Sequence, residues 1–187
     1  MLSRLPAGGS ASESPPSAVE LAGTELSGWE LFERRLSDLG GHTIRLETPP
    51  FGAAILRALD DLGFPARHAA VDDDARALVE LESTADVWTA DVGVTLADAA
   101  IAEVGGLLVS NGPGRRRLAS LAPPIHVAIV REDALRETLE DALAGPLDRT
   151  SVMIVGPSRT ADIEGVLVRG VHGPRELVVA IIPRGGS

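Results

Sequence analysis

Apolar residues along this chain fall into short continuous runs, and segments with helical spacing lie between several of these runs. The runs that we expect to form strands are residues 42–47, 66–71, 85–94, 107–110, 125–130, 151–155 and 177–182. The segments that we expect to form helices are residues 28–39, 51–62, 73–81, 97–104 and 131–143. This alternation predicts an α/β fold, a three-layer sandwich whose mostly parallel central sheet is covered by helices on both faces. The last two strands have no helix between them, so we expect them to be antiparallel neighbours at an edge.

The first 18 residues differ in composition from the rest. They are rich in Gly, Ser, Pro and Ala and poor in large apolar side chains, which predicts a disordered leader followed by one α/β domain over residues 19–187. The leader lacks the apolar centre of a secretory signal, and no apolar run approaches the ~20 residues that a membrane span needs. We therefore expect a cytoplasmic protein that does not contact membranes.

The net charge and the missing residue types narrow the possible chemistry. The net charge of −10 argues against a nucleic-acid-binding surface. The chain has no Cys, which excludes disulfides, a thiolate nucleophile and a cysteine-ligated iron–sulfur cluster. It also has no Lys, which excludes Schiff-base chemistry and a P-loop lysine. The four His residues show no zinc-binding spacing, so we expect no metal and no cofactor.

The segment 156–174 is long, polar and rich in glycine, and it lies between two apolar runs, so it is the first candidate for a site. The residues that we expect to form an anion pocket are Gly156, Ser158, Arg159 and Thr160. Asp162 and Glu164 are candidates for a general base, or for groups that orient Arg159 or His172. The alternative is that these hydroxyls and carboxylates only cap a helix or turn.

Three further elements are candidates. His172 and Gly173 lie in a Gly-Val-His-Gly-Pro turn, where the imidazole is a proton shuttle or merely bonds the backbone. Glu103 lies near the end of the expected helix 97–104 and is either a catalytic group or a solvated carboxylate. Arg117 belongs to a cluster of three arginines that contacts an acidic ligand or simply forms a turn. We expect these groups to meet beyond the carboxyl ends of the strands, where open α/β sheets bind ligands.

Two motifs resemble a known family. The sequence GPSRTADIE followed by GVHGP, and the stretch from Asp91 to Glu103, are similar to the lactate-utilization protein C family, whose members contain a LUD domain. The resemblance implies the three-layer fold of formyltetrahydrofolate cyclo-ligase, sugar-phosphate isomerases and CoA transferases. One departure is Val104-Gly105-Gly106, which stands where the family usually has hydroxyl-bearing residues.

The resemblance implies a role in the oxidation of L-lactate to pyruvate with iron–sulfur partner proteins. Because this chain has no Cys, its own part would be accessory: substrate binding, regulation or assembly. The alternatives are a free-standing enzyme acting on a small phosphorylated or CoA-linked carboxylate, and a sensor of hydroxy acids. In each case we expect a small carboxylate ligand, and self-association stays open.

Overall fold

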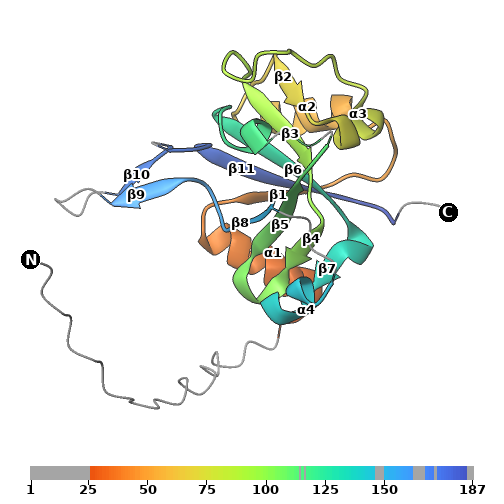
Figure 1. Cartoon of the computed structure of the whole chain (residues 1–187), viewed down its shortest axis with the longest axis vertical. Helices are drawn as coiled ribbons and strands as arrows, with labels where there is room; N and C mark the ends of the chain where they lie inside the picture. The colour runs from red at the N-terminus through yellow and green to blue at the C-terminus, as the bar shows by residue number, and fades with distance from the viewer. Residues whose placement is uncertain are drawn as a thin grey trace, which may run out of the picture.

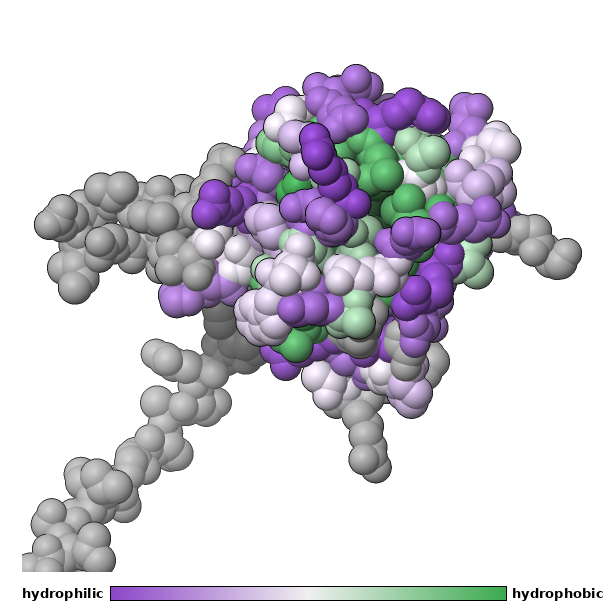
Figure 2. Space-filling model, turned by 90° about the horizontal axis from the view of Figure 1, so that it is seen from above, coloured by the Kyte–Doolittle hydropathy of each residue, from purple (hydrophilic) through white to green (hydrophobic). Residues whose placement is uncertain are grey.

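The computed structural model describes residues 26–184 except 114, 116, 146–149, 162–166 and 171, and of residues 160, 161 and 167–169 only the backbone. The predicted leader over residues 1–18 lies outside this range. Within it, two sheets stack on one another, and helices cover the free face of the larger sheet (Figure 1). Seen from the end formed by β2, α2 and α3, the surface is mainly hydrophilic, with small apolar areas between (Figure 2).

The larger sheet has five strands in the order β1-β11-β6-β3-β2, and every neighbouring pair is parallel. Its strands are β1 (His42–Arg45), β2 (Ala69–Val71), β3 (Val92–Leu96), β6 (Ile125–Arg131) and β11 (Glu176–Ile182). The three central strands are almost entirely buried, as expected for parallel strands covered on both faces.

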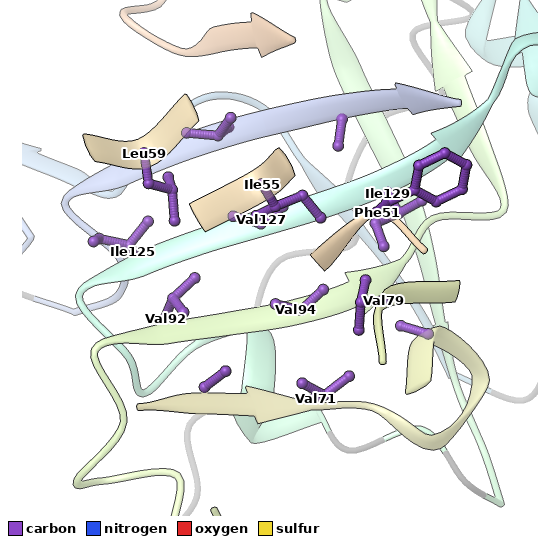
Figure 3. Packing of buried hydrophobic residues seen from close by; sticks show 14 of the residues in the cluster. Phe51, Ile55, Leu59, Val71, Val79, Val92, Val94, Ile125, Val127 and Ile129 are labelled. Atoms are coloured by element: carbon purple, nitrogen blue, oxygen red, sulfur yellow. The ribbon is translucent and has the colours of Figure 1, made fainter. Parts of the chain in front are cut away.

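Helices α2 (Gly52–Asp61) and α3 (Asp73–Val79) cover one face of this sheet. Ile55 and Leu59 of α2 are fully buried and pack on Val92, Val94 and other residues that alternate along the strands (Figure 3). Alternation along each strand sends the intervening residues to the opposite face. The sheet therefore has two separate apolar cores, one on each side.

The opposite face packs against α1 (Gly28–Asp38) and the second sheet. The second sheet has the order β7-β4-β5-β8 and is formed by β4 (Ala99–Ile101), β5 (Gly106–Asn111), β7 (Leu135–Arg136) and β8 (Thr150–Ile154). Phe32 and Leu36 of α1 and Leu107 of β5 are fully buried in this second core, with Val179 and other residues of the larger sheet. The described chain is completed by α4 (Leu139–Leu143), the short 3₁₀ helices η1 (Ala102–Val104), η2 (Arg117–Ser120) and η3 (Glu132–Ala134), and a hairpin of β9 (Arg159–Ala161) and β10 (Leu167–Arg169).

The predicted α/β class and parallel sheet are confirmed, as are the first three helices. The helix predicted over residues 97–104 is wrong: this segment forms β4 and η1, and β4 pairs with β5 and β7. Ala99, Ala100 and Ile101 are all buried in the second sheet, and a short apolar run of this kind does not distinguish strand from helix.

Three other expectations need correction. Residues 131–143 form η3, β7 and α4 instead of one helix, because Thr138 and Asp141 form a capping box that begins α4 late in the segment. The strand expected from residue 85 begins at Val92. The last two long strands are not edge partners: β8 pairs with β5 in the second sheet, whereas β11 lies between β1 and β6.

Candidate functional site

A cavity of about 410 Å³ lies between β8 and the larger sheet. Its lining includes residues 152–155 of and after β8, Leu39 after α1, and residues 117, 120 and 121. His126 of β6 and Leu177 of β11 form the part contributed by the larger sheet. The remaining lining comes from residues 156–159 and 172–174, so both ends of the glycine-rich segment reach the same cavity.

The cavity lies at the amino ends of the parallel strands, because His126 and Leu177 are each the second residue of their strand. The expectation of a site beyond the carboxyl ends does not hold for this cavity. The reason is topological: β8 belongs to the second sheet, and the segment after it runs to the start of β11. The chain that lines the cavity therefore approaches the parallel sheet from its amino edge.

The two ends of the segment 156–174 are held together by backbone hydrogen bonds. Ser158 N–H donates to the Pro174 carbonyl at 2.9 Å, and Gly170 N–H donates to the Ser158 carbonyl at 2.9 Å. Gly173 faces Ser158 so closely that a Cβ at Gly173 would lie 3.2 Å from the Ser158 Cβ. Gly156 has a φ of +77°, which lets the chain turn away from β8. A side chain at Gly156 would strain the backbone, and one at Gly173 would crowd Ser158.

The described lining of the cavity is basic. It includes Arg117, Arg159, His126 and His172 and contains no Asp or Glu, although the whole chain has a net charge of −10. Ser120 and Ser158 add hydroxyl groups, and the remaining side chains are apolar or glycine. Both arginines are exposed, and their guanidinium groups can pair with an anion through charge-assisted hydrogen bonds.

Arg117 reaches the cavity because η2 packs closely on β3. A Cβ on Gly93 of β3 would overlap the carbonyl oxygen of Ala119, so only glycine lets η2 approach the sheet this closely. Within η2, the Ser120 hydroxyl donates to the Arg117 carbonyl at 2.9 Å. The position of Arg117 thus depends on a glycine in a different element.

His126 was not among the predicted site residues. It is 1% exposed, and its Nε2 lies 2.9 Å from the Thr95 hydroxyl oxygen. Burial lowers the pKa of His126 to about 4, so the imidazole is neutral at physiological pH. The signal in the sequence was a polar residue inside the apolar run Ile-His-Val-Ala-Ile-Val, whose other residues are buried hydrocarbon.

Glu103 does not line the cavity. Its carboxylate accepts a hydrogen bond of 2.6 Å from Leu139 N–H, at the first turn of α4. Asp98 is likewise engaged elsewhere: it accepts bonds from Ser110 N–H and from Arg115, which also pairs with Asp74. Arg115 is therefore part of an ion-pair network and contributes nothing to the cavity, in contrast to Arg117.

Three predicted residues are placed only in part or not at all. Thr160 lies in β9, but only its backbone is described. Asp162 and Glu164 lie outside the described residues. Of the predicted site residues, the structure brings together around one cavity Gly156, Ser158, Arg159, His172, Gly173 and Arg117.

Across the described part of the chain, no group of three or more His, Asp or Glu side chains is arranged to hold a metal ion. No helix there is both long and apolar enough to cross a membrane. The described lining of the cavity offers guanidinium, imidazole, hydroxyl and backbone groups.

Fold and cavity together define an α/β protein with a basic, partly apolar cavity between two sheets. This chain belongs to the LUD-domain family, whose model matches residues 65–182. The resemblance seen in the sequence motifs is thereby confirmed.

Three relatives illustrate the family. The chain is 33% identical over 165 residues to the lactate utilization protein C of Deinococcus radiodurans, covering 81% of this chain and 77% of that protein. It is 43% identical over 94 residues to the lactate utilization protein C of an Exiguobacterium species, covering 46% of this chain and 41% of the relative. An uncharacterized Escherichia coli protein, YkgG, is 35% identical over 138 residues, covering 66% of this chain and 58% of the relative.

One solved structure supports the fold. The crystal structure of a DUF162 family protein from Deinococcus radiodurans matches with a TM-score of 0.57 and 24% identity, covering 82% of this chain and 95% of that one. The likeness to cyclo-ligases, sugar-phosphate isomerases and CoA transferases stays a prediction.

Proposed function

We propose that this protein works in lactate utilization and binds a small carboxylate in the cavity between its two sheets. The observation on which this rests is the cavity lining: two arginines and the exposed His172 without a described carboxylate, in a strongly acidic chain. The names of the relatives from Deinococcus and Exiguobacterium support the pathway. L-Lactate fits the chemistry, since it has a carboxylate for the arginines and a hydroxyl for a neutral polar group.

The residues have separate roles in this proposal. Arg117 and Arg159, both exposed in the lining, bind the carboxylate, and Ser158 offers a hydroxyl. His172 is also exposed in the lining and can donate a hydrogen bond or exchange a proton there. Asp162 and Glu164 remain proposed general bases, and Thr160 a proposed ligand-binding residue.

We place the protein in the cytoplasm beside iron–sulfur proteins that take the electrons from lactate. Lactate oxidation to pyruvate releases two electrons, and this chain has no cysteine with which to hold a thiolate-ligated cluster. Its part is therefore accessory: it binds or presents the carboxylate, and its partners perform the redox step. An association measurement with the purified partner proteins tests this arrangement.

A second candidate is favoured by the size of the cavity. A volume of about 410 Å³ falls in the range of pockets that hold drug-sized ligands, which are much larger than lactate. A CoA-linked or phosphorylated carboxylate would use more of this space and would still present an anion to the arginines. Titration with coenzyme A separates the two candidates. Saturable binding that is weakened by Arg117→Gln would favour the enzyme, and no binding would favour the accessory role.

Growth on L-lactate as the sole carbon source tests the proposal. A strain without this gene is complemented with the native protein, with Arg159→Gln, with His172→Ala, or with Arg34→Gln. The exposed side chain of Arg34 on α1 pairs with Asp38 and is not part of the cavity lining, so Arg34 is the matched control for loss of an arginine. We expect growth to return with the native and Arg34→Gln proteins only. Normal growth without the gene would contradict the proposal.

A further inference from the structure

The Thr95–His126 pair is not explained by anion binding. The proposed carboxylate ligand has two exposed arginines to pair with. His126, in contrast, is neutral and lines the buried part of the cavity, which we call its floor. A neutral imidazole adds little to the binding of a carboxylate. The burial of a polar pair between two strands of mainly hydrocarbon residues needs another explanation, because burying polar groups is costly.

The residues beside His126 in the sheet have no polar side chains. Its register partners are Gly93 on β3 and Leu177 on β11, one without a side chain and the other apolar. Leu177 is also the other residue that the larger sheet contributes to the cavity. A ligand that reaches the floor therefore meets hydrocarbon everywhere on the sheet except at His126.

Thr95 fixes which ring nitrogen faces a ligand. The Thr95 hydroxyl oxygen lies 2.9 Å from Nε2, so Nδ1 is the ring nitrogen that remains to be offered to a ligand. If Thr95 donates to Nε2, Nδ1 is protonated and donates; if Nε2 donates to Thr95, Nδ1 accepts. A ligand hydroxyl can both accept and donate, so it satisfies Nδ1 in either tautomer.

We propose that His126, positioned by Thr95, binds the 2-hydroxyl group of the carboxylate and makes the cavity selective for 2-hydroxy acids over plain carboxylates. The inference rests on the proposed carboxylate site. It assigns two separate roles. The arginines bind the negative charge, which every carboxylate has, and the Thr95–His126 pair recognises the substituent on the carbon next to the carboxylate. A hydrogen bond of this neutral kind provides about 3- to 10-fold of selectivity.

Calorimetric titration of the full chain with L-lactate and with propionate tests the proposal. Propionate has the same carboxylate and carbon chain but lacks the hydroxyl, so the ratio of the two dissociation constants isolates the hydroxyl contact. We expect the native protein to prefer lactate by about 3- to 10-fold. His126→Phe should bring the ratio close to one while the affinity for propionate stays nearly unchanged.

Two further variants keep the test decisive. Thr95→Val removes only the hydroxyl that orients the ring, so it should lower the ratio even if His126→Phe fails to fold. His68→Gln, a change at an exposed histidine outside the cavity lining, should leave the ratio unchanged. A native protein that binds both acids equally, or variants at Thr95 and His126 that keep the lactate preference, would overturn this inference and leave the carboxylate site standing. A native protein that binds neither acid would overturn both.

Discussion

Gly93 of β3 lies directly beneath the carbonyl of Ala119, with no room between them for a side chain. This contact holds η2 on the parallel sheet and so places Arg117 and Ser120 at the edge of the cavity. Gly93 is also the register partner of His126. A single glycine thus links the residue that lines the cavity floor to the element that brings a positive charge to its edge.

We expect Gly93→Ala to destabilise the protein and to weaken carboxylate binding together. The new methyl group would overlap the Ala119 carbonyl, so η2 must move away, at a cost of about 1–3 kcal/mol in the free energy of unfolding. Denaturant unfolding and lactate titration measure the two effects. Gly145→Ala is the matched control, since a Cβ at Gly145 would meet nothing within 4 Å. Equal behaviour of the two variants would contradict the role of Gly93.

Glu103→Ala should reduce stability without affecting ligand binding. The Glu103 carboxylate accepts a 2.6 Å bond from Leu139 N–H, so its removal leaves a backbone donor in the first turn of α4 without this acceptor. A loss of about 1–2 kcal/mol in the free energy of unfolding is expected. Unfolding by urea measures it, with lactate titration beside it. A Glu103→Ala protein of native stability that has lost ligand binding would instead favour a catalytic or ligand-binding role for this carboxylate.

Acid should destabilise the protein through His126. The pKa of His126 is about 4 in the folded protein and 6.5 when unperturbed, so between these values the unfolded chain binds a proton that the folded chain does not. By linkage, stability is then lost as the pH falls from about 6.5 to about 4. The total effect of this one group is about 3 kcal/mol, and it stops growing below pH 4.

Urea unfolding at pH 7 and at pH 4.5 measures this effect, with His126→Phe as the comparison. The native protein should lose more stability between these pH values than the variant. The pKa of Asp91 is lowered from its ordinary value, so the stabilising contribution of Asp91 is lost at more acidic pH than that of His126. The cause there is hydrogen bonding of its carboxylate to the backbone N–H groups of His68 and Arg67. Equal losses in the native protein and the variant would contradict the assignment to His126.

The sequence predicted those elements whose local spacing of apolar residues matches the face that they bury in the core. The helical stripe of α1 and the continuous apolar runs of β6 and β11 predicted these elements correctly. Ala99-Ala100-Ile101 was misassigned because its strand character comes from pairing with β5, which no local spacing encodes. The same holds for β8 and β11, whose separation into two sheets depends on contacts across the chain.

The candidate site shows the same limit. The glycine-rich segment 156–174 was recognisable by its length and composition, and the residues at both its ends do reach the cavity. His126 was missed because a lone histidine in an apolar run has no local partner; Thr95 lies 31 positions away. The sequence made Glu103 a candidate site residue. In the structure its carboxylate accepts a hydrogen bond from Leu139 N–H, 36 positions away, at the start of α4.

Binding of L-lactate to the purified chain tests the central claim most directly. The native protein, the double variant Arg117→Gln/Arg159→Gln and the control Arg34→Gln are titrated with L-lactate in a calorimeter under identical conditions. We predict saturable binding to the native and Arg34→Gln proteins and at least a 10-fold weaker affinity in the double variant, because hydrogen bonds from charged groups contribute about 1.5–3 kcal/mol each. Lactate binding that survives the loss of both arginines would contradict the proposed site, and no binding to the native protein would contradict the proposed ligand.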